Sequence, residues 1–347
     1  MPAGNDGSKI DLVLEGGGIK GIGLAGAASV LQEEGFQPQN LAGASAGAIA
    51  ACLLAAGYQP DELRSLLLGL DFNEFKDPAW EDRVPLVGAP LSIVRDHGIY
   101  EGRFFLEWMR DRLAERDVRT FGDLVHPEYA DTPQYRYRAQ VIASDITDKS
   151  LLVLPRDAER FGIEPDGLGV AEAVRMSMSI PLFFEPWRWR SENDGKEHLI
   201  VDGGVLSNFP VWLFDSPGEP DWPTFGLLLV EPEPEKPVAE RLEPRAEERT
   251  GVADFLRALV QTMLEAHDRM YLDNASYVRT VRVPTLGVRT TEFDLSRDRA
   301  QALYDSGRDA ATAFLKEWNF DAYKRAFRLR SPPTRRDLIR LAANRNR

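Results

Sequence analysis

Three short glycine-rich stretches hold the residues of this chain whose types and spacing could do chemistry. The first to consider is Gly43-Ala44-Ser45-Ala46-Gly47, which has the pattern G-x-S-x-G. On a sharp strand-to-helix turn, this pattern exposes the serine Oγ, and the small flanking residues relieve the crowding. The positive end of the following helix also favours an oxyanion nearby. Ser45 is therefore a candidate nucleophile, although the same residues also suit a tight turn with a helix-capping serine.

A nucleophilic serine needs a base, and Asp202 in "LIVDGGVLSNFP" is the strongest candidate. Apolar residues lead into it, and Gly203 and Gly204 let the backbone turn at once, so that the carboxylate can point into a cavity. The alternative is an Asp-Gly turn that closes a hairpin. Histidine is the more familiar partner of serine. The surroundings of the four histidines favour exposed or capping roles for each of them: His97, His126, His198 and His267.

The third stretch, "LVLEGGGIKGIGLAG", places a glycine cluster after a short apolar run. Gly16-x-Gly18-x-x-Gly21 matches the dinucleotide-binding fingerprint, but the acid expected at the end of the next strand is absent, because the Ser45 turn occupies that position. A phosphate-binding P-loop would need G-K-[ST], which is also absent. The remaining use of these amides is to bind the oxyanion of a tetrahedral intermediate. Gly17 and Gly18 are the preferred donors.

The segments that must position these residues read as strand-to-helix units. Residues 10–14 form an apolar run that predicts a strand, and residues 19–34 follow with helical spacing. The next unit repeats this plan, with a strand over 40–45 and a helix over 46–57. Two such units predict an α/β fold with a mostly parallel sheet. Further helices are expected at 60–68, 102–116, 170–178, 252–271 and 297–318, and strands at 135–144, 150–155, 224–232 and 278–284.

Composition limits the function classes. The 347 residues have a formal net charge of −13, which argues against a nucleic-acid partner. The lone Cys52 requires no oxidising compartment and reads as a small buried residue. The N-terminus lacks the pattern of a signal peptide, and no stretch is apolar enough to predict a transmembrane helix. We therefore expect a cytoplasmic protein. No clustered metal-ligand motif is visible.

Taken together in this order, the motifs "GGGIKG", "GASAG" and "DGG", with "AVRMSMSIPLFFEP" before the last, resemble the patatin-like phospholipase family. The resemblance implies a three-layer α/β/α fold and a Ser45–Asp202 dyad without histidine. It also implies an oxyanion loop formed by Gly16, Gly17, Gly18, Ile19 and Lys20, and no metal or organic cofactor. Many relatives carry arginine where this chain has Lys20. The lysine keeps the positive charge but lacks the planar guanidinium, which can donate two parallel hydrogen bonds to one ligand.

The resemblance implies hydrolysis of lipid carboxylic esters through an acyl-enzyme, with a lipid or a membrane surface as the substrate. An acyltransferase or thioesterase with the same dyad is the first alternative, and a nucleotide-binding protein is a weaker one. The expected organisation is a catalytic domain at 9–230, an acidic proline-rich loop at 231–250, an extension at 251–320 and a basic tail at 321–347. The loop is either a lid or a tolerated insertion, and the tail, from Lys324 on, either contacts anionic lipid or is simply solvated. The sequence leaves the oligomeric state open.

Overall fold

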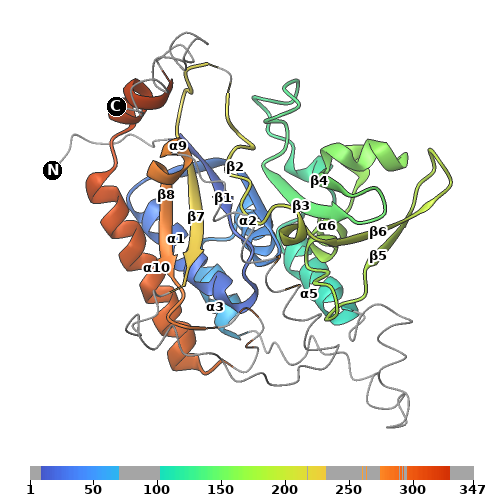
Figure 1. Cartoon of the computed structure of the whole chain (residues 1–347), viewed down its shortest axis with the longest axis horizontal. Helices are drawn as coiled ribbons and strands as arrows, with labels where there is room; N and C mark the ends of the chain where they lie inside the picture. The colour runs from blue at the N-terminus through green and yellow to red at the C-terminus, as the bar shows by residue number, and fades with distance from the viewer. Residues whose placement is uncertain are drawn as a thin grey trace, which may run out of the picture.

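The computed structural model describes residues 9–69, 102–216, 218–231, 260, 263, 274–288, 290, 292 and 295–328 (Figure 1). Within these residues, eight strands form one mixed sheet. The strands are β1 (Lys9–Leu14), β2 (Gln37–Ala44), β3 (Ala139–Asp145), β4 (Ser150–Leu154), β5 (Trp187–Arg190), β6 (Glu197–Asp202), β7 (Thr224–Val230) and β8 (Thr280–Pro284). Their order is β5-β6-β3-β2-β1-β7-β8, with β4 paired to β3 outside this path.

The centre of the sheet is parallel and one end is antiparallel. Strands β3, β2, β1, β7 and β8 pair in parallel, whereas β6 and β4 run antiparallel to β3, and β5 runs antiparallel to β6. In a parallel sheet the carboxyl ends of the strands meet at one edge, where ligands usually bind. β1 and β2 both end at this edge, and each is followed by one of the glycine-rich turns.

The two faces of the sheet are buried against different partners. Along β1, Leu12 and Leu14 pack into a large hydrophobic cluster with the helices, while Val13 belongs to a second cluster with Phe209, Leu213 and neighbouring residues. This alternation follows from the two-residue period of a strand. Among the described residues, the second face is covered largely by the segment that follows Asp202 in the chain.

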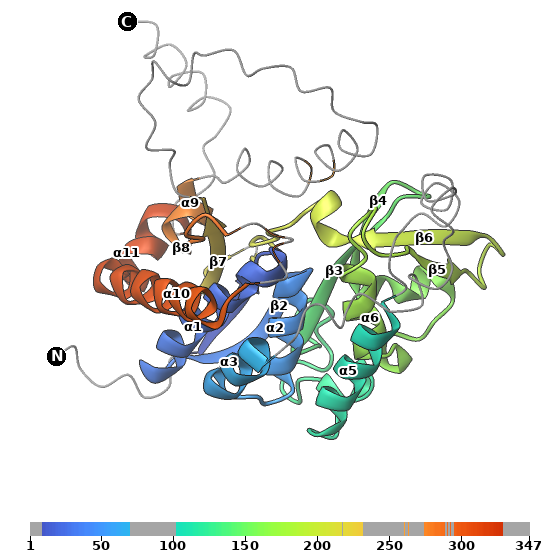
Figure 2. The ribbon, with the colours of Figure 1, turned by 90° about the horizontal axis from the view of Figure 1, so that it is seen from below.

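Helices cover the first face (Figure 2). They are α1 (Gly21–Glu33), α2 (Ala46–Ala55), α3 (Pro60–Gly69), α5 (Arg103–Ala114), α6 (Val170–Ser177) and α10 (Arg297–Glu317), while α9 (Asn274–Val278) and α11 (Phe320–Tyr323) are short. α1 and α10 pack closely because both carry glycine at the crossing. A Cβ at Gly26 would lie 2.0 Å from the Tyr304 carbonyl oxygen, and one at Gly307 would lie 1.9 Å from the Gly23 carbonyl oxygen.

The predicted α/β class is confirmed, and most predicted elements appear within a few residues of their expected bounds. Three differ. The helix expected from residue 19 begins with a 3₁₀ turn at Gly18–Lys20, and the strand expected over 135–144 begins only at Ala139. The strand expected over 278–284 begins at Thr280, because 274–278 forms α9.

Several predicted segments lie mostly or wholly outside the described residues. They are the acidic loop after Glu231, the helix expected over 252–271 and the basic tail beyond Arg328. At the start of that tail, Lys324 pairs with Glu219 at 3.0 Å and Arg328 pairs with Asp215 at 2.6 Å. Within the part of the chain that is described, no helix combines the length and apolar character needed to cross a bilayer.

Candidate active site

Ser45 sits on a strained turn between β2 and α2. Its φ is 51° and its ψ is −126°, a conformation that non-glycine residues rarely adopt and that costs on the order of 1–3 kcal/mol. The side chain makes no capping hydrogen bond to α2, so the capping alternative is not realised. Instead, the Oγ points toward the Met178 Sδ, 3.5 Å away. The turn therefore holds the hydroxyl away from its own helix.

The two glycines that flank Ser45 are required by close packing. A Cβ at Gly43 would lie 2.3 Å from the Gly47 backbone, and a Cβ at Gly47 would lie 2.3 Å from the Leu14 carbonyl oxygen. Gly21 has a similar role, since its Cβ would lie 3.0 Å from the Ala46 Cβ. The sharp turn can form only because these positions lack side chains.

Asp202 ends β6 and is completely buried. Its Oδ1 accepts a hydrogen bond of 2.8 Å from the Gly204 amide, while its Oδ2 is buried with no hydrogen-bond partner among the described residues. The next glycine, Gly203, packs so tightly that a Cβ would lie 2.3 Å from the Ile142 carbonyl oxygen. No hairpin follows, because the next strand, β7, pairs with β1 and β8. The carboxylate thus keeps one oxygen available inside the protein.

Burial raises the pKa of Asp202 to about 7, even though the Gly204 amide and the nearby Ser45 hydroxyl lower it in part. Burial removes the water that stabilises the charged carboxylate, and the neutral acid depends less on that water, so burial favours the protonated form. A pKa near neutrality is what a general base requires, because the group must be ionised and still basic enough to take a proton.

Three consecutive residues at the end of α6 join the serine turn to the Asp202 strand. Ser177 accepts a hydrogen bond of 2.8 Å from the Ser45 amide and donates one of 2.6 Å to the Ile142 carbonyl. Met178 lies against the Ser45 hydroxyl, and the Ser179 carbonyl accepts a bond of 3.0 Å from the Asp202 amide. These residues belong to "AVRMSMSIP", but nothing in the sequence marks them as contacts of both side chains.

The glycine loop lies directly beside Ser45. A Cβ at Gly16 would lie 3.0 Å from the Ser45 Cβ and 2.1 Å from the Asn208 Oδ1. Asn208 fastens the loop by donating a bond of 2.9 Å to the Gly16 carbonyl and by accepting one of 3.1 Å from the Gly16 amide. Asn208 is a further site residue, and no motif in the sequence indicates its role. It lies in the same stretch as Asp202, six residues later.

The backbone amides of the five predicted oxyanion-loop residues differ in whether they already donate a hydrogen bond within the protein. The Gly16 amide is bound by Asn208, the Ile19 amide donates to the Thr290 carbonyl at 3.4 Å, and the Lys20 amide donates to the Gly17 carbonyl at 3.2 Å. The amides of Gly17 and Gly18 have no hydrogen-bond partner among the described residues. Within this loop, they are the two donors left for a ligand.

Lys20 lies at the same site but has a partner. Its ammonium pairs with the Glu231 carboxylate at 2.9 Å, and the second oxygen of Glu231 accepts a hydrogen bond of 2.8 Å from Thr285. The Lys20 side chain is only 6% exposed. The Lys20 ammonium therefore lies at the cavity that Ser45 lines, and Glu231, the first residue of the acidic segment, holds it in place.

One small cavity brings most of the predicted residues together, but Gly18 and Ile19 of the predicted oxyanion loop do not line it. Its volume is about 20 Å³, enough for roughly one water molecule. It is lined by Glu15, Gly16, Gly17, Lys20, Ser45, Ile180, Asp202, Asn208, Leu229 and Thr290. Of the histidines, His126 and His198 lie in the described part, where both are buried and not exposed as expected, and neither lines this cavity. His97 and His267 lie outside the described residues.

Comparison with known proteins places the chain in a family. The family model described as patatin-like phospholipase matches residues 12–215. The YqhO protein of Bacillus subtilis is 37% identical over 311 residues, which cover 90% of this chain and 99% of YqhO. An NTE family protein of Mycobacterium tuberculosis, Rv2565, is 27% identical over 327 residues, which cover 89% of this chain and 47% of Rv2565.

Among solved structures, VipD from Legionella pneumophila matches with a TM-score of 0.51 and 18% sequence identity. The match covers 90% of this chain and 67% of the VipD chain, and at this identity it supports the fold alone. The family model spans more than half of the chain, and YqhO aligns over nearly its whole length. The chain therefore belongs to the patatin-like phospholipase family.

Proposed function

We propose that the protein is a lipid acyl hydrolase that cleaves carboxylic esters through Ser45 and Asp202. The observation that carries this proposal is the cavity lined by Ser45, Asp202 and Gly17, beside which the Asp202 Oδ2 and the amides of Gly17 and Gly18 have no partner among the described residues. A nucleophile, a base and oxyanion donors are the parts that acyl transfer needs.

In the proposed reaction, the Ser45 Oγ attacks the ester carbonyl while its proton passes to the Asp202 Oδ2. The amides of Gly17 and Gly18 and the amino end of α2 stabilise the oxyanion. The protonated Asp202 then gives its proton to the departing alcohol, which leaves an ester between the acyl group and Ser45. Water attacks this ester as one of its protons passes to Asp202, the proton then moves from Asp202 to the departing Ser45 oxygen, and the fatty acid is released. The dyad thus serves both half-reactions.

Release of fatty acid from phospholipid micelles tests the reaction class. The purified protein is expected to release free fatty acid with water as the only acceptor. In a parallel assay with an added alcohol or thiol acceptor, an acyltransferase would form a new ester or thioester in preference to free acid. Transfer to the acceptor without hydrolysis would replace the hydrolase proposal by the transferase alternative.

We expect activity to rise with pH and to level off above about pH 7. Asp202 acts only when ionised, and burial raises its pKa to about 7, so the base is protonated and inactive in more acidic solution. Below this pKa, kcat/KM should fall about tenfold per pH unit. The measurement is kcat/KM for a non-ionising ester between pH 5 and 9, in a range where the fold is stable by circular dichroism. A flat profile across this range would contradict a base with this pKa.

We also expect Glu231→Gln to favour anionic esters. The substitution removes the carboxylate that pairs with Lys20 while keeping the side-chain shape and the bond from Thr285. The freed ammonium should lower KM for a phosphate-bearing ester by about fivefold, since such a pair is worth ~1 kcal/mol. KM for a neutral ester of the same chain length should change little.

The matched control for this prediction is Glu34→Gln, which removes an exposed carboxylate at the end of α1. It should leave both KM values unchanged. Equal effects of Glu231→Gln on the neutral and the anionic ester would show that Lys20 does not contact the anionic group.

A further inference from the structure

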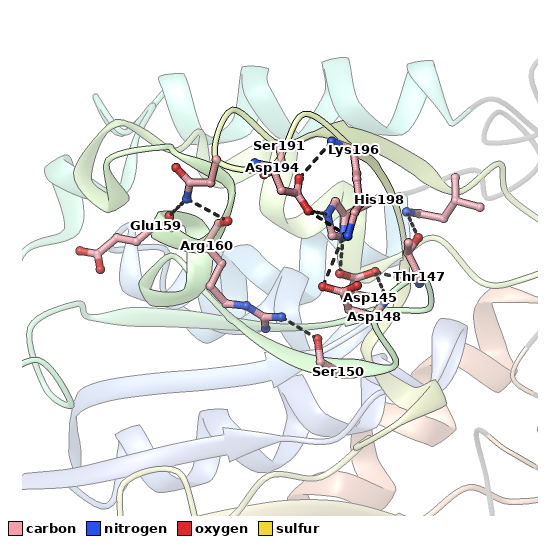
Figure 3. Close-up of polar contacts among 12 residues, drawn as sticks. Asp145, Thr147, Asp148, Ser150, Glu159, Arg160, Ser191, Asp194, Lys196 and His198 are labelled. Carbon is pink, nitrogen blue, oxygen red and sulfur yellow. Dashed lines mark hydrogen bonds and ion pairs between the residues drawn. The ribbon is translucent and has the colours of Figure 1, made fainter.

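A second cluster of chemically capable side chains lies at the antiparallel end of the sheet. It contains Asp145 at the end of β3, Asp148 in the turn to β4, and His198 on β6 (Figure 3). Asp145 and His198 are almost fully buried, whereas the Asp148 side chain is 45% exposed. Strand pairing brings them together, since Asp145 and His198 are 53 residues apart in the chain. None of the three lines the Ser45 cavity.

The ligand atoms of these residues converge. The His198 Nδ1 lies 2.8 Å from the Asp145 Oδ2 and 3.9 Å from the Asp148 Oδ2. One ligand atom from each residue lies within 4.8 Å of the others. In a tetrahedral Zn²⁺ site with bonds of about 2.0–2.2 Å, ligand atoms lie about 3.4 Å from one another. The site therefore forms when the 2.8 Å contact between His198 and Asp145 widens and the half-exposed Asp148 side chain moves inward.

The residues around these three side chains would orient them for metal binding. The second ring nitrogen of His198, Nε2, faces the Asp194 Oδ2 at 3.5 Å. A metal-binding histidine usually donates its other N–H to such a carboxylate. The Oδ1 of Asp145 accepts bonds from the amides of Thr147 and Asp148 at 2.9 and 3.2 Å, which leaves its Oδ2 directed at the histidine.

The orientation of His198 is also fixed by packing. Its ring meets Phe161 edge to face with centroids 5.0 Å apart, and Phe161 stacks on Trp189 at 4.2 Å. Lys196 is a nearby cation, and it pairs with Asp194 at 3.5 Å and not with the other two carboxylates. The pocket around Nδ1 therefore holds two carboxylates and one imidazole, a donor set that suits a borderline-soft divalent ion such as Zn²⁺.

We propose that Asp145, Asp148 and His198 form a structural Zn²⁺ site, with Asp194 orienting His198. The ion replaces the proton shared between the Nδ1 and the Asp145 carboxylate, and water fills its remaining position on the exposed side of Asp148. Its location indicates what it stabilises. Asp145 pairs with Ile200 and Ala143 pairs with Asp202 in the β3–β6 ladder, so the ion joins the two strands that position Asp202.

The test uses the full chain after treatment with a chelator, titrated with Zn²⁺ by calorimetry and followed by thermal unfolding. One ion should bind per chain, and Tm should rise by about 5 °C at Zn²⁺ a hundredfold above Kd. Mg²⁺ at the same concentration should give no such rise, because it prefers an octahedral shell of oxygens.

Asp148→Asn decides between the metal site and a simple hydrogen bond. Asp148 is half exposed, and its side chain is not part of the 2.8 Å contact between His198 and Asp145, so the variant should fold. It should weaken Zn²⁺ binding at least tenfold and lose the rise in Tm. The matched control is Asp131→Asn, which removes an exposed carboxylate elsewhere and should bind Zn²⁺ as the unchanged chain does. Binding and stabilisation that persist in Asp148→Asn, or an unchanged chain that binds no Zn²⁺, would overturn the proposal.

Discussion

Ser45→Ala is expected to abolish ester hydrolysis, with a loss of kcat of about 10⁴-fold or more. The proposed reaction forms a covalent ester on the Ser45 oxygen, so alanine removes the nucleophile itself and not only a binding contact. The remaining rate should come from the oxyanion donors and from substrate binding. The measurement is kcat for a chromogenic ester, with the unchanged chain and the variant assayed side by side.

The fold should survive this change. The Ser45 side chain makes a weak contact to Met178 and lies near Asp202, and the Ser45 amide keeps its bond to Ser177 in the variant. Alanine is also less restricted than larger residues on the strained turn, so the Tm should change by only a few degrees. Ser65→Ala, on the exposed face of α3, is the matched control and should retain full activity. A folded Ser45→Ala protein with undiminished activity would place the nucleophile elsewhere.

Asp202→Asn is expected to lower activity by about 10³- to 10⁴-fold while making the folded protein more stable above pH 7. Asparagine keeps an oxygen to accept the Gly204 amide but cannot take the proton of Ser45. Activity should therefore fall without loss of the turn. The measurements are kcat/KM for the same ester and the free energy of unfolding as a function of pH.

The sign of the stability change follows from the raised pKa of Asp202. An unfolded aspartate loses its proton near pH 3.8, whereas the buried group keeps it to about pH 7. Stability from the protonated Asp202 is therefore fully present below pH 3.8 and is lost as pH rises to about 7. Above about pH 7, the buried Asp202 carboxylate is ionised in both the folded and the unfolded chain, and its burial lowers the free energy of unfolding by on the order of 4 kcal/mol. Asparagine removes this cost, so the gain should be largest above pH 7 and should shrink toward pH 4. A variant that is less stable at pH 8 would contradict this account of the burial.

The sequence predicted those parts of the fold that depend on local patterns. The apolar run before Gly16 and the Ala-rich stretch after Ser45 have the periodicity of a buried strand and a helix, and both elements formed. β5 and β6 were not among the predicted strands, because β5 has only four residues and β6 begins with the polar pair Glu197 and His198. The bounds of β3 and β8 were misjudged because strand-forming residues at 135–138 and 278–279 are used in turns and in α9.

The candidate site could be predicted where glycine marks it. Gly43, Gly47 and Gly203 are needed for backbone approaches that side chains would block, and such glycines are visible in a sequence. Ser177 and Asn208 were missed because their contacts arise only when separate strands are brought together. Gly17 and Gly18 were preferred as donors from the sequence, but the reason that they remain free is set by the fold, because the amides of the other three loop residues have partners: Gly16, Ile19 and Lys20.

Labelling with a fluorophosphonate probe, followed by mass spectrometry of the digested protein, tests most directly whether residue 45 is the activated nucleophile. We expect one adduct, on the peptide that contains Ser45, formed much more slowly in Asp202→Asn and absent from Ser45→Ala. An adduct on a different residue, or labelling of Ser45 at an unchanged rate without the Asp202 carboxylate, would contradict the proposed dyad.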